Sequence, residues 1–129
     1  MEDNCVFCKI IRRDLPSYIV YENDNVISFL DIDPTCFAHT LVVPKIHVRT
    51  IMDFNDEDLS VFIVEVKHVS KMLINILNAD GFKLTQNNGE TSGQVVPHVH
   101  IHIKPSFKIV PPIDKNDIDK VFRIIKEGR

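Results

Sequence analysis

Residues 98–103 read His-Val-His-Ile-His-Ile, and this stretch carries the clearest secondary-structure signal in the 129-residue chain. Imidazole and aliphatic side chains alternate strictly in it, which predicts a β-strand with one polar and one apolar face. We expect the strand to span residues 98–104 and to end at Pro105. Neighbouring histidines on the polar face would lie about 6.5–7 Å apart, the rise of two strand residues. Three of the six histidines of the chain would then share one surface.

A long helix is predicted upstream of this strand. Apolar residues recur every three or four positions from Leu59 to Leu77, as they do on the buried face of a helix. Asn55 can cap the first turn, and the acidic residues 56–58 suit the positive end of the helix dipole. Residues 78–81 are expected to end the helix. The predicted buried face consists of Leu59, Phe62, Ile63, Val66, Val69, Leu73, Ile76 and Leu77.

Further strand-like segments lie on both sides of this helix, and a second helix is predicted near the end of the chain. Apolar residues at helical spacing between Ile118 and Ile125 indicate a C-terminal helix within 113–127. The order of elements predicts an α+β fold in which a largely antiparallel five-stranded sheet carries one long helix and one C-terminal helix. The first three strands should form a meander. The predicted strands are 18–22, 26–31, 40–43, 81–86 and 98–104.

The composition limits the class of protein. A chain of this length, with 44% hydrophobic and 26% charged residues, fits one globular domain over residues 1–129. We expect its core at about 5–105 and a C-terminal helical extension at about 113–127. The net charge of -3 argues against a nucleic-acid partner. No apolar run suits a membrane span and the N-terminus does not resemble a signal peptide, so we expect a cytoplasmic location with reduced cysteines.

Two clusters of residues could carry chemistry. The histidine array could bind a metal ion, hold phosphate oxygens, or let one imidazole attack phosphorus; a solvated polar strand face is the alternative. Cys5 and Cys8 have the spacing of half a tetrahedral zinc site, and two buried apolar cysteines are the alternative. Cys36 and His68 are interpreted as a loop thiol and a helix-surface histidine.

Several motifs in one order resemble the histidine triad (HIT) family. Residues 98–104 are similar to its His-φ-His-φ-His-φ-φ signature, where φ is an apolar residue, and the resemblance covers residues 5 to about 105. It is closest to the short, Hint-like or bacterial-type branch, which hydrolyses nucleoside phosphoramidates and related adenylates. Lys104 departs from the signature, and Val95 stands where members often carry Ser or Thr. The other matching blocks are 5–11, 21–24, 29–34, 39–47 and 87–98.

The resemblance implies a role for four histidines. His100 would attack the α-phosphorus and form a nucleotidyl-histidine intermediate, which water then hydrolyses. His102 would hold a phosphate oxygen, and His98 would orient the site through its hydrogen bonds. His39 matches a fourth active-site histidine of the family, although it could also be structural.

The resemblance also implies the residues that contact the nucleotide. Asn87 would contact the ribose and phosphate region, Asp31 would hold the ribose hydroxyls and Ile32 would pack near the base. The backbone N–H groups of Gly93, Gln94 and Val95 are expected to cradle phosphate. Without a side-chain hydroxyl, Val95 would contribute only its N–H. The expected apolar wall of the base pocket, which could equally be ordinary core, consists of Phe7, Ile10 and Leu15.

The resemblance further implies a structural zinc ion and a second subunit. Cys5, Cys8, His47 and His98 would ligate the zinc, and the chemistry would need no metal. A homodimer would join two sheets through the long helix at 56–77 and the strand at 81–86.

The function expected from this resemblance is that of a nucleotidyl hydrolase acting on purine nucleoside phosphoramidates or adenylates. Three alternatives stay open on sequence alone. These are a dinucleoside polyphosphate hydrolase, a zinc hydrolase whose triad binds the catalytic metal, and a scaffold protein that binds AMP without turnover.

Overall fold

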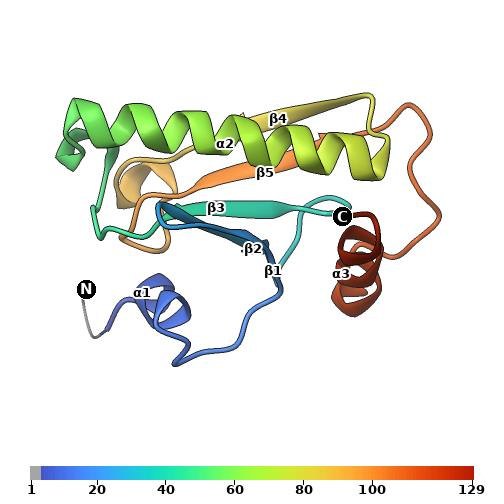
Figure 1. The fold of residues 1–129 in the computed structure, drawn as a ribbon, viewed down its shortest axis with the longest axis horizontal. Coiled ribbons are helices and arrows are strands. Elements are labelled where there is room, and N and C mark those ends of the chain that lie inside the picture. Colours follow the sequence, from blue (N-terminus) through green and yellow to red (C-terminus); the bar gives the residue numbers. More distant parts are fainter. Residues whose placement is uncertain (1–3) are drawn as a thin grey trace.

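The computed structural model describes residues 4–129, which form one five-stranded sheet and three α-helices within that range (Figure 1). The strand order is β1-β2-β3-β5-β4, and every neighbouring pair is antiparallel. This confirms the α+β fold and the meander of the first three strands. The elements are α1 Val6–Ile11, β1 Ile19–Glu22, β2 Val26–Leu30, β3 Thr40–Pro44, α2 Asp56–Leu77, β4 Gly81–Thr85, β5 Ile101–Ser106 and α3 Ile118–Glu127.

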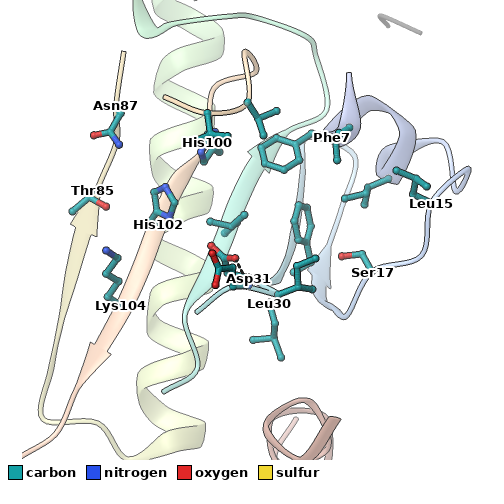
Figure 2. A pocket seen from close by; sticks show the side chains of 18 of the residues that line it. Phe7, Leu15, Ser17, Leu30, Asp31, Thr85, Asn87, His100, His102 and Lys104 are labelled. Carbon is teal, nitrogen blue, oxygen red and sulfur yellow. Dashed lines mark hydrogen bonds between the residues drawn. The ribbon is translucent and has the colours of Figure 1, made fainter. Parts of the chain in front are cut away.

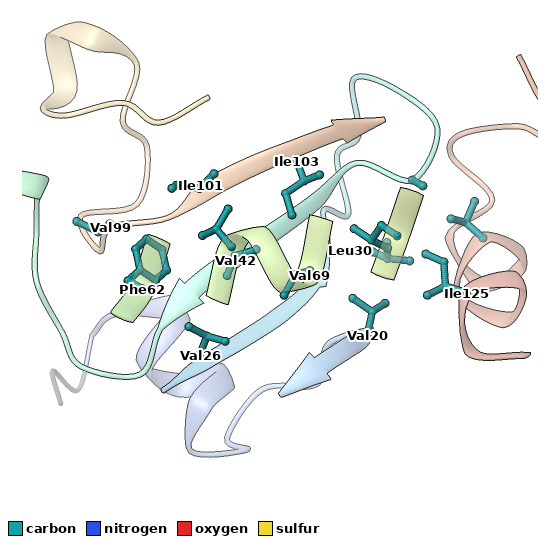
Figure 3. Packing of buried hydrophobic residues seen from close by; sticks show 14 of the residues in the cluster. Val20, Val26, Leu30, Val42, Phe62, Val69, Val99, Ile101, Ile103 and Ile125 are labelled. Atoms are coloured by element: carbon teal, nitrogen blue, oxygen red, sulfur yellow. The ribbon is translucent and has the colours of Figure 1, made fainter. Parts of the chain in front are cut away.

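Helices α2 and α3 pack on one side of the sheet, and the short helix α1 packs on the other. In Figure 1, α2 lies along one side and α1 lies on the other. Alternating apolar residues of the strands, such as Val42 and Ile103, meet Val69 of α2 in the larger core (Figure 3). The opposite side forms a smaller core in which α1 packs mainly on β2 and β3, with Ile19 of β1 at its edge. That smaller core contains Cys5, Phe7, Cys8, Ile10, Ile27, Phe29, Leu41 and Val43.

Helix α2 has the bounds that the sequence predicts. The Asn55 side chain accepts the N–H of Asp58 at 2.8 Å, and Asn78 ends the helix in the left-handed conformation with φ 53°. One predicted core residue differs, because the Ile63 side chain is 47% exposed. The sheet contacts a stripe centred on Phe62, Val66 and Val69, and Ile63 lies beside that stripe, toward β4.

Strand β5 starts later and ends later than predicted. It begins at Ile101, because residues 98–100 are held by loops: the His98 N–H donates to Val96 O and the Val99 N–H donates to Val48 O. The prediction that Pro105 ends the strand is wrong. Pairing with β3 stops at Ile103, so the missing N–H of Pro105 leaves no ladder bond unmade on that side.

Helix α3 lies within the predicted C-terminal range. Asp117 caps it by accepting the N–H of Lys120, and its buried residues Val121 and Ile125 complete the larger core. Tyr18 ties it to β1 through an edge-to-face contact with Phe122. Among residues 4–129, no helix combines the length and apolarity needed to cross a bilayer.

Candidate active site

A pocket of about 550 Å³ opens on the α1 side of the sheet. Helix α1 has only six residues and covers β2 and β3, so the same side of β5 and β4 is left uncovered. His100, His102 and Lys104 line the pocket from β5 and the residues before it, and Phe7 faces them from α1 (Figure 2). The sequence pattern therefore places its alternating polar residues in a cavity, because Ile101 and Ile103 turn to the opposite core.

His100 has a defined tautomer. Its Nδ1 lies 2.8 Å from the carbonyl oxygen of His98, which can only accept, so Nδ1 carries the proton and Nε2 carries the lone pair. Burial lowers the pKa of His100, which keeps the ring neutral near pH 7. The Phe7 ring packs edge-to-face at 5.0 Å between centroids and fixes the ring orientation. A neutral imidazole with a free Nε2 lone pair is the form that acts as a nucleophile.

His102 has the opposite tautomer, set by a chain that begins in the backbone. The Thr35 N–H donates to His39 Nδ1 at 3.1 Å, so the His39 proton must be on Nε2. That Nε2 lies 2.9 Å from His102 Nδ1, which therefore accepts. Burial, with repulsion from His100 and His39, lowers the pKa of His102 to about 4. The neutral ring thus carries its proton on Nε2.

Asp31 lies beside this chain at the pocket. Its Oδ2 is 3.5 Å from His39 Nε2, and its Oδ1 accepts the Asp33 N–H at 2.9 Å. Asp31, His39 and His102 offer ligand atoms within 4.8 Å of one another. However, the Thr35 N–H directs a His39 proton into the middle of this group. The three residues are therefore arranged as a hydrogen-bond chain.

The three-amide phosphate cradle stays a prediction, and two of its three N–H groups already donate to carbonyl oxygens of the same loop. The N–H of Gly93 donates to Glu90 O, and that of Gln94 donates to Gly89 O. The Gln94 side chain also turns away and holds the loop through Arg49 O at 2.6 Å. Among residues 4–129, the Val95 N–H has no such acceptor. Val95 is 89% exposed and lines the pocket, as do Gly93 and Asn87.

The apolar wall of the pocket matches the sequence prediction. Phe7, Ile10 and Leu15 line it, with Phe29 behind them. Ile32 also lines the pocket and is 78% exposed, so an aromatic ligand entering here would cover it. The core interpretation holds as well, because Phe7 and Ile10 are buried in the smaller core.

His98 and His39 do not line this pocket. Both are almost fully buried and act through neighbours: His98 through its carbonyl bond to His100, and His39 through His102. The sequence interpretation gave no role to Thr35 or Lys104. Lys104 could have been found, since it continues the alternation of His100 and His102. Thr35 acts through its backbone N–H, which leaves no side-chain signal.

Cys5, Cys8, His47 and His98 form a separate buried group behind His100, here called the Cys2His2 cluster. The Cys5 Sγ–His98 Nδ1, Cys8 Sγ–His98 Nδ1 and Cys8 Sγ–His47 Nδ1 distances are 3.4, 3.6 and 3.3 Å. The two Nδ1 atoms are 3.1 Å apart. Tetrahedral zinc ligands would lie about 3.6 Å (S to N) and about 3.3 Å (N to N) apart.

The His98 tautomer also suits a ligand. Its Nε2 lies 2.9 Å from the Pro44 carbonyl oxygen and must donate to it, so Nδ1 presents a lone pair to the cluster. Burial, opposed by the hydrogen bond to Pro44, lowers the pKa of His98 to about 4. A backbone carbonyl on the non-ligating nitrogen is the usual partner of a metal-bound histidine. The residues present therefore fit a tetrahedral metal ion.

Comparisons with known proteins agree with this fold and site. The family model of the HIT domain matches residues 12–109, and the chain belongs to the HIT (histidine triad) family. It is 41% identical to an uncharacterized HIT-like protein of Methanocaldococcus jannaschii over 95% of this chain and 98% of that protein. It is 36% identical to the adenosine 5'-monophosphoramidase HNT1 of Saccharomyces cerevisiae, over 95% of this chain and 79% of that protein.

Among solved structures, the chain is similar to a hypothetical histidine triad nucleotide-binding protein of Sulfolobus tokodaii. The TM-score is 0.86 at 33% identity, over 96% of this chain and 91% of the other. This similarity extends beyond the HIT-domain match to both ends of the chain and supports the arrangement of α1 and α3 around the sheet.

Proposed function

We propose that this protein is a nucleotidyl hydrolase that cleaves purine nucleoside phosphoramidates or adenylates through a covalent intermediate on His100. One observation carries the proposal: a bare His100 Nε2 and a protonated His102 Nε2 belong to adjacent rings of one pocket, with centroids 5.0 Å apart. A nucleophile and a hydrogen-bond donor side by side suit attack on phosphorus with stabilisation of its oxygens. The yeast relative named a monophosphoramidase supports the substrate class.

In the first step, the His100 Nε2 lone pair forms a bond to the α-phosphorus, and the bond from phosphorus to the leaving group breaks. The leaving group keeps the bonding electrons and takes its proton from water, because Val95 has no hydroxyl. The ring becomes cationic while its Nδ1–H stays bonded to the His98 carbonyl, which stabilises the charge. A water molecule then attacks phosphorus and gives its proton to the hydroxide left by the first step. The bond to Nε2 breaks, its electrons return to Nε2, and the nucleoside monophosphate leaves with His100 neutral again.

The remaining polar groups can orient the nucleotide. The His102 Nε2–H and the Val95 N–H would donate to the phosphate oxygens. The Asp31 carboxylate, at the edge of the same pocket, would accept from the ribose hydroxyls, and the wall of Phe7 and Ile10 would contact the base. This arrangement binds a phosphate without a basic surface, which is consistent with the net charge of -3.

Trapping the intermediate tests the proposal. Incubation with adenosine 5'-phosphoramidate, acid-free quenching and mass spectrometry should detect an adenylyl adduct on wild-type protein and none on His100→Ala. His68→Ala, a substitution on the exposed side of α2, is the matched control and should retain the adduct. Turnover that proceeds with no adduct, or an adduct that persists in His100→Ala, would contradict the proposed intermediate. A parallel panel of dinucleoside polyphosphates separates that alternative, and AMP binding without any turnover would identify the scaffold alternative.

We further propose that the Cys2His2 cluster binds a structural zinc ion. Four protein ligands would close the coordination shell, so the ion would join α1 to the residue beside the nucleophile and take no part in the reaction. The test is metal analysis of purified protein, with about one zinc per chain expected. Cys8→Ser should lose the metal and stability, and Cys36→Ser should keep both. Metal content that is unchanged in Cys8→Ser would overturn the assignment.

A homodimer is proposed on the opposite side of the molecule. Strand β4 is an edge strand, and its Phe82 and Leu84 are about half exposed beside Ile63 of α2. A second copy could pair with β4 and cover this apolar surface. Light scattering should give twice the monomer mass for wild type and the monomer mass for Leu84→Glu. Val64→Glu, equally exposed but outside this surface, is the control. A cytoplasmic, reducing location, in which the three cysteines would stay reduced, also remains part of the proposal.

A further inference from the structure

Lys104 brings a positive charge into the pocket at a position where the family signature has an apolar residue. It is the third member of the alternating series after His100 and His102, so it lies about 6.5–7 Å beyond His102 along β5. Figure 2 shows its side chain on the same side of the sheet, next to His102, and it lines the cavity.

Within residues 4–129, the Lys104 ammonium has no anionic partner. It is partly buried, yet no carboxylate of residues 4–129 lies within ion-pair distance of it. Asp31 also lines the pocket, but its carboxylate accepts the Asp33 N–H and faces His39. Removing an ammonium from water without a counter-charge is costly.

A second lysine makes this position more positive. Lys83 of β4 stands directly opposite Lys104 in the antiparallel ladder, and like charges in that relation destabilise a sheet. The positive charges of both lysines affect Cys36. Burial raises the pKa of the Cys36 thiol, and the charges of Lys104, Lys115 and Lys83 oppose that rise. Lys115 donates to the Pro34 carbonyl oxygen and does not line the pocket, so Lys104, with Lys83 opposite it in the ladder, is the lysine that faces a ligand.

We infer that Lys104, supported by Lys83, forms a subsite for a second phosphate group of the bound nucleotide, beyond the phosphate that His100 and His102 contact. This inference rests on the proposed function. The ligand class is a nucleotide with two phosphate groups, and the second can be attached in two ways. It can be on the ribose 2′ or 3′ oxygen, near Asp31, or it can extend the 5′ phosphate chain.

Calorimetric titrations of the full-length protein with four commercially available ligands test the inference. AMP is the reference, adenosine 2′,5′-bisphosphate and 3′,5′-bisphosphate carry a ribose phosphate, and ADP carries a chain phosphate. In wild type, at least one of the last three should bind about tenfold more tightly than AMP, because a charge-assisted hydrogen bond is added. This preference should decrease as the salt concentration rises.

Substitutions assign the preference to the two lysines. Lys104→Met should abolish it with little change in AMP affinity, Lys104→Arg should restore most of it, and Lys83→Met should reduce it. Lys108→Met, an exposed lysine outside the pocket, is the matched control. Thermal melts establish that each variant folds.

Two results would overturn the inference: no ligand preferred over AMP in wild type, or a preference that survives in Lys104→Met. Both leave the proposed function intact, since AMP binds in each case. Failure of AMP itself to bind would contradict the proposed function, and the subsite would fall with it.

Discussion

Replacing Thr35 by proline removes the backbone N–H and the side-chain hydroxyl beside His39, and tests the hydrogen-bond chain that sets the His102 tautomer. The backbone N–H, which proline lacks, donates to His39 Nδ1 at 3.1 Å. Without it, His39 can carry its proton on Nδ1. The Thr35 hydroxyl, 3.4 Å from Nδ1 in wild type, is also absent from proline and so cannot donate there. His39 Nε2 would then be bare and could accept from a His102 proton on Nδ1. The His102 Nε2, which faces the proposed phosphate, would then carry no proton to donate.

The expected size of the effect follows from the strength of one hydrogen bond. A neutral intramolecular hydrogen bond contributes about 1 kcal/mol net, which corresponds to a tautomer bias of about fivefold. The rate constant kcat/KM for an adenosine phosphoramidate should therefore fall by about fivefold in Thr35→Pro, well short of the loss expected for His100→Ala. Thr35→Val keeps the N–H, removes only the hydroxyl, and should retain wild-type activity.

Nitrogen-15 NMR of the imidazole rings measures the cause directly. Wild type and Thr35→Val should show His102 protonated on Nε2, and Thr35→Pro should show a substantial population protonated on Nδ1. A folded Thr35→Pro variant that keeps the Nε2 proton and wild-type kinetics would refute the role of this backbone group. Equal rate losses in Thr35→Pro and Thr35→Val would assign the effect to the Thr35 hydroxyl, 3.4 Å from His39 Nδ1, instead of the backbone N–H.

Three further perturbations follow from the burial and capping of named residues. The folded pKa of His102, about 4, is below its usual 6.5, so its contribution is present above pH 6.5 and is lost toward pH 4. In urea unfolding, this partly buried ring should contribute about 1 kcal/mol less stability at pH 5 than at pH 7 after allowance for solvent screening, and His102→Gln should lack that share of the pH dependence. Phe7→Ala should cost about 3 kcal/mol in unfolding free energy, because Phe7 is buried against Phe29 and His100, and the same variant should raise KM. Asn55→Ala should cost about 1 kcal/mol without changing kcat, since it removes only the cap of α2; an unchanged melting temperature would refute this.

The helices and most strands could be predicted because their signals are local. Helix α2 combines a regular apolar period with a capping Asn55 and a left-handed Asn78, and the sequence predicts both ends. The start of β5 could not be predicted, because it depends on a hydrogen bond between Val99 and Val48, two loop residues distant in sequence. The same holds for Ile63: periodicity identifies an apolar stripe but does not determine how much of it the sheet covers.

The site shows the same division between side chains and backbone. The order of residue types, through its resemblance to the HIT family, predicts that His100, His102, Asp31 and the apolar wall meet in one pocket. It does not predict which nitrogen of each ring is protonated, because that depends on backbone groups: the carbonyls of Pro44 and His98 and the N–H of Thr35. Gln94 is another example, since its N–H donates to the Gly89 carbonyl oxygen, a bond that its residue type does not reveal.

His98 has a consequence for how mutants of this protein should be interpreted. Its ring is held by Pro44 on one nitrogen and faces the Cys2His2 cluster with the other, while its carbonyl oxygen orients His100. A substitution at His98 therefore changes the ring contacts and, through the backbone, the aim of the nucleophile. Activity lost in such a variant would look like the loss of an acid or base, although the side chain never reaches the substrate cavity. A mutation by itself can assign a role as acid or base only to a residue that lines the cavity.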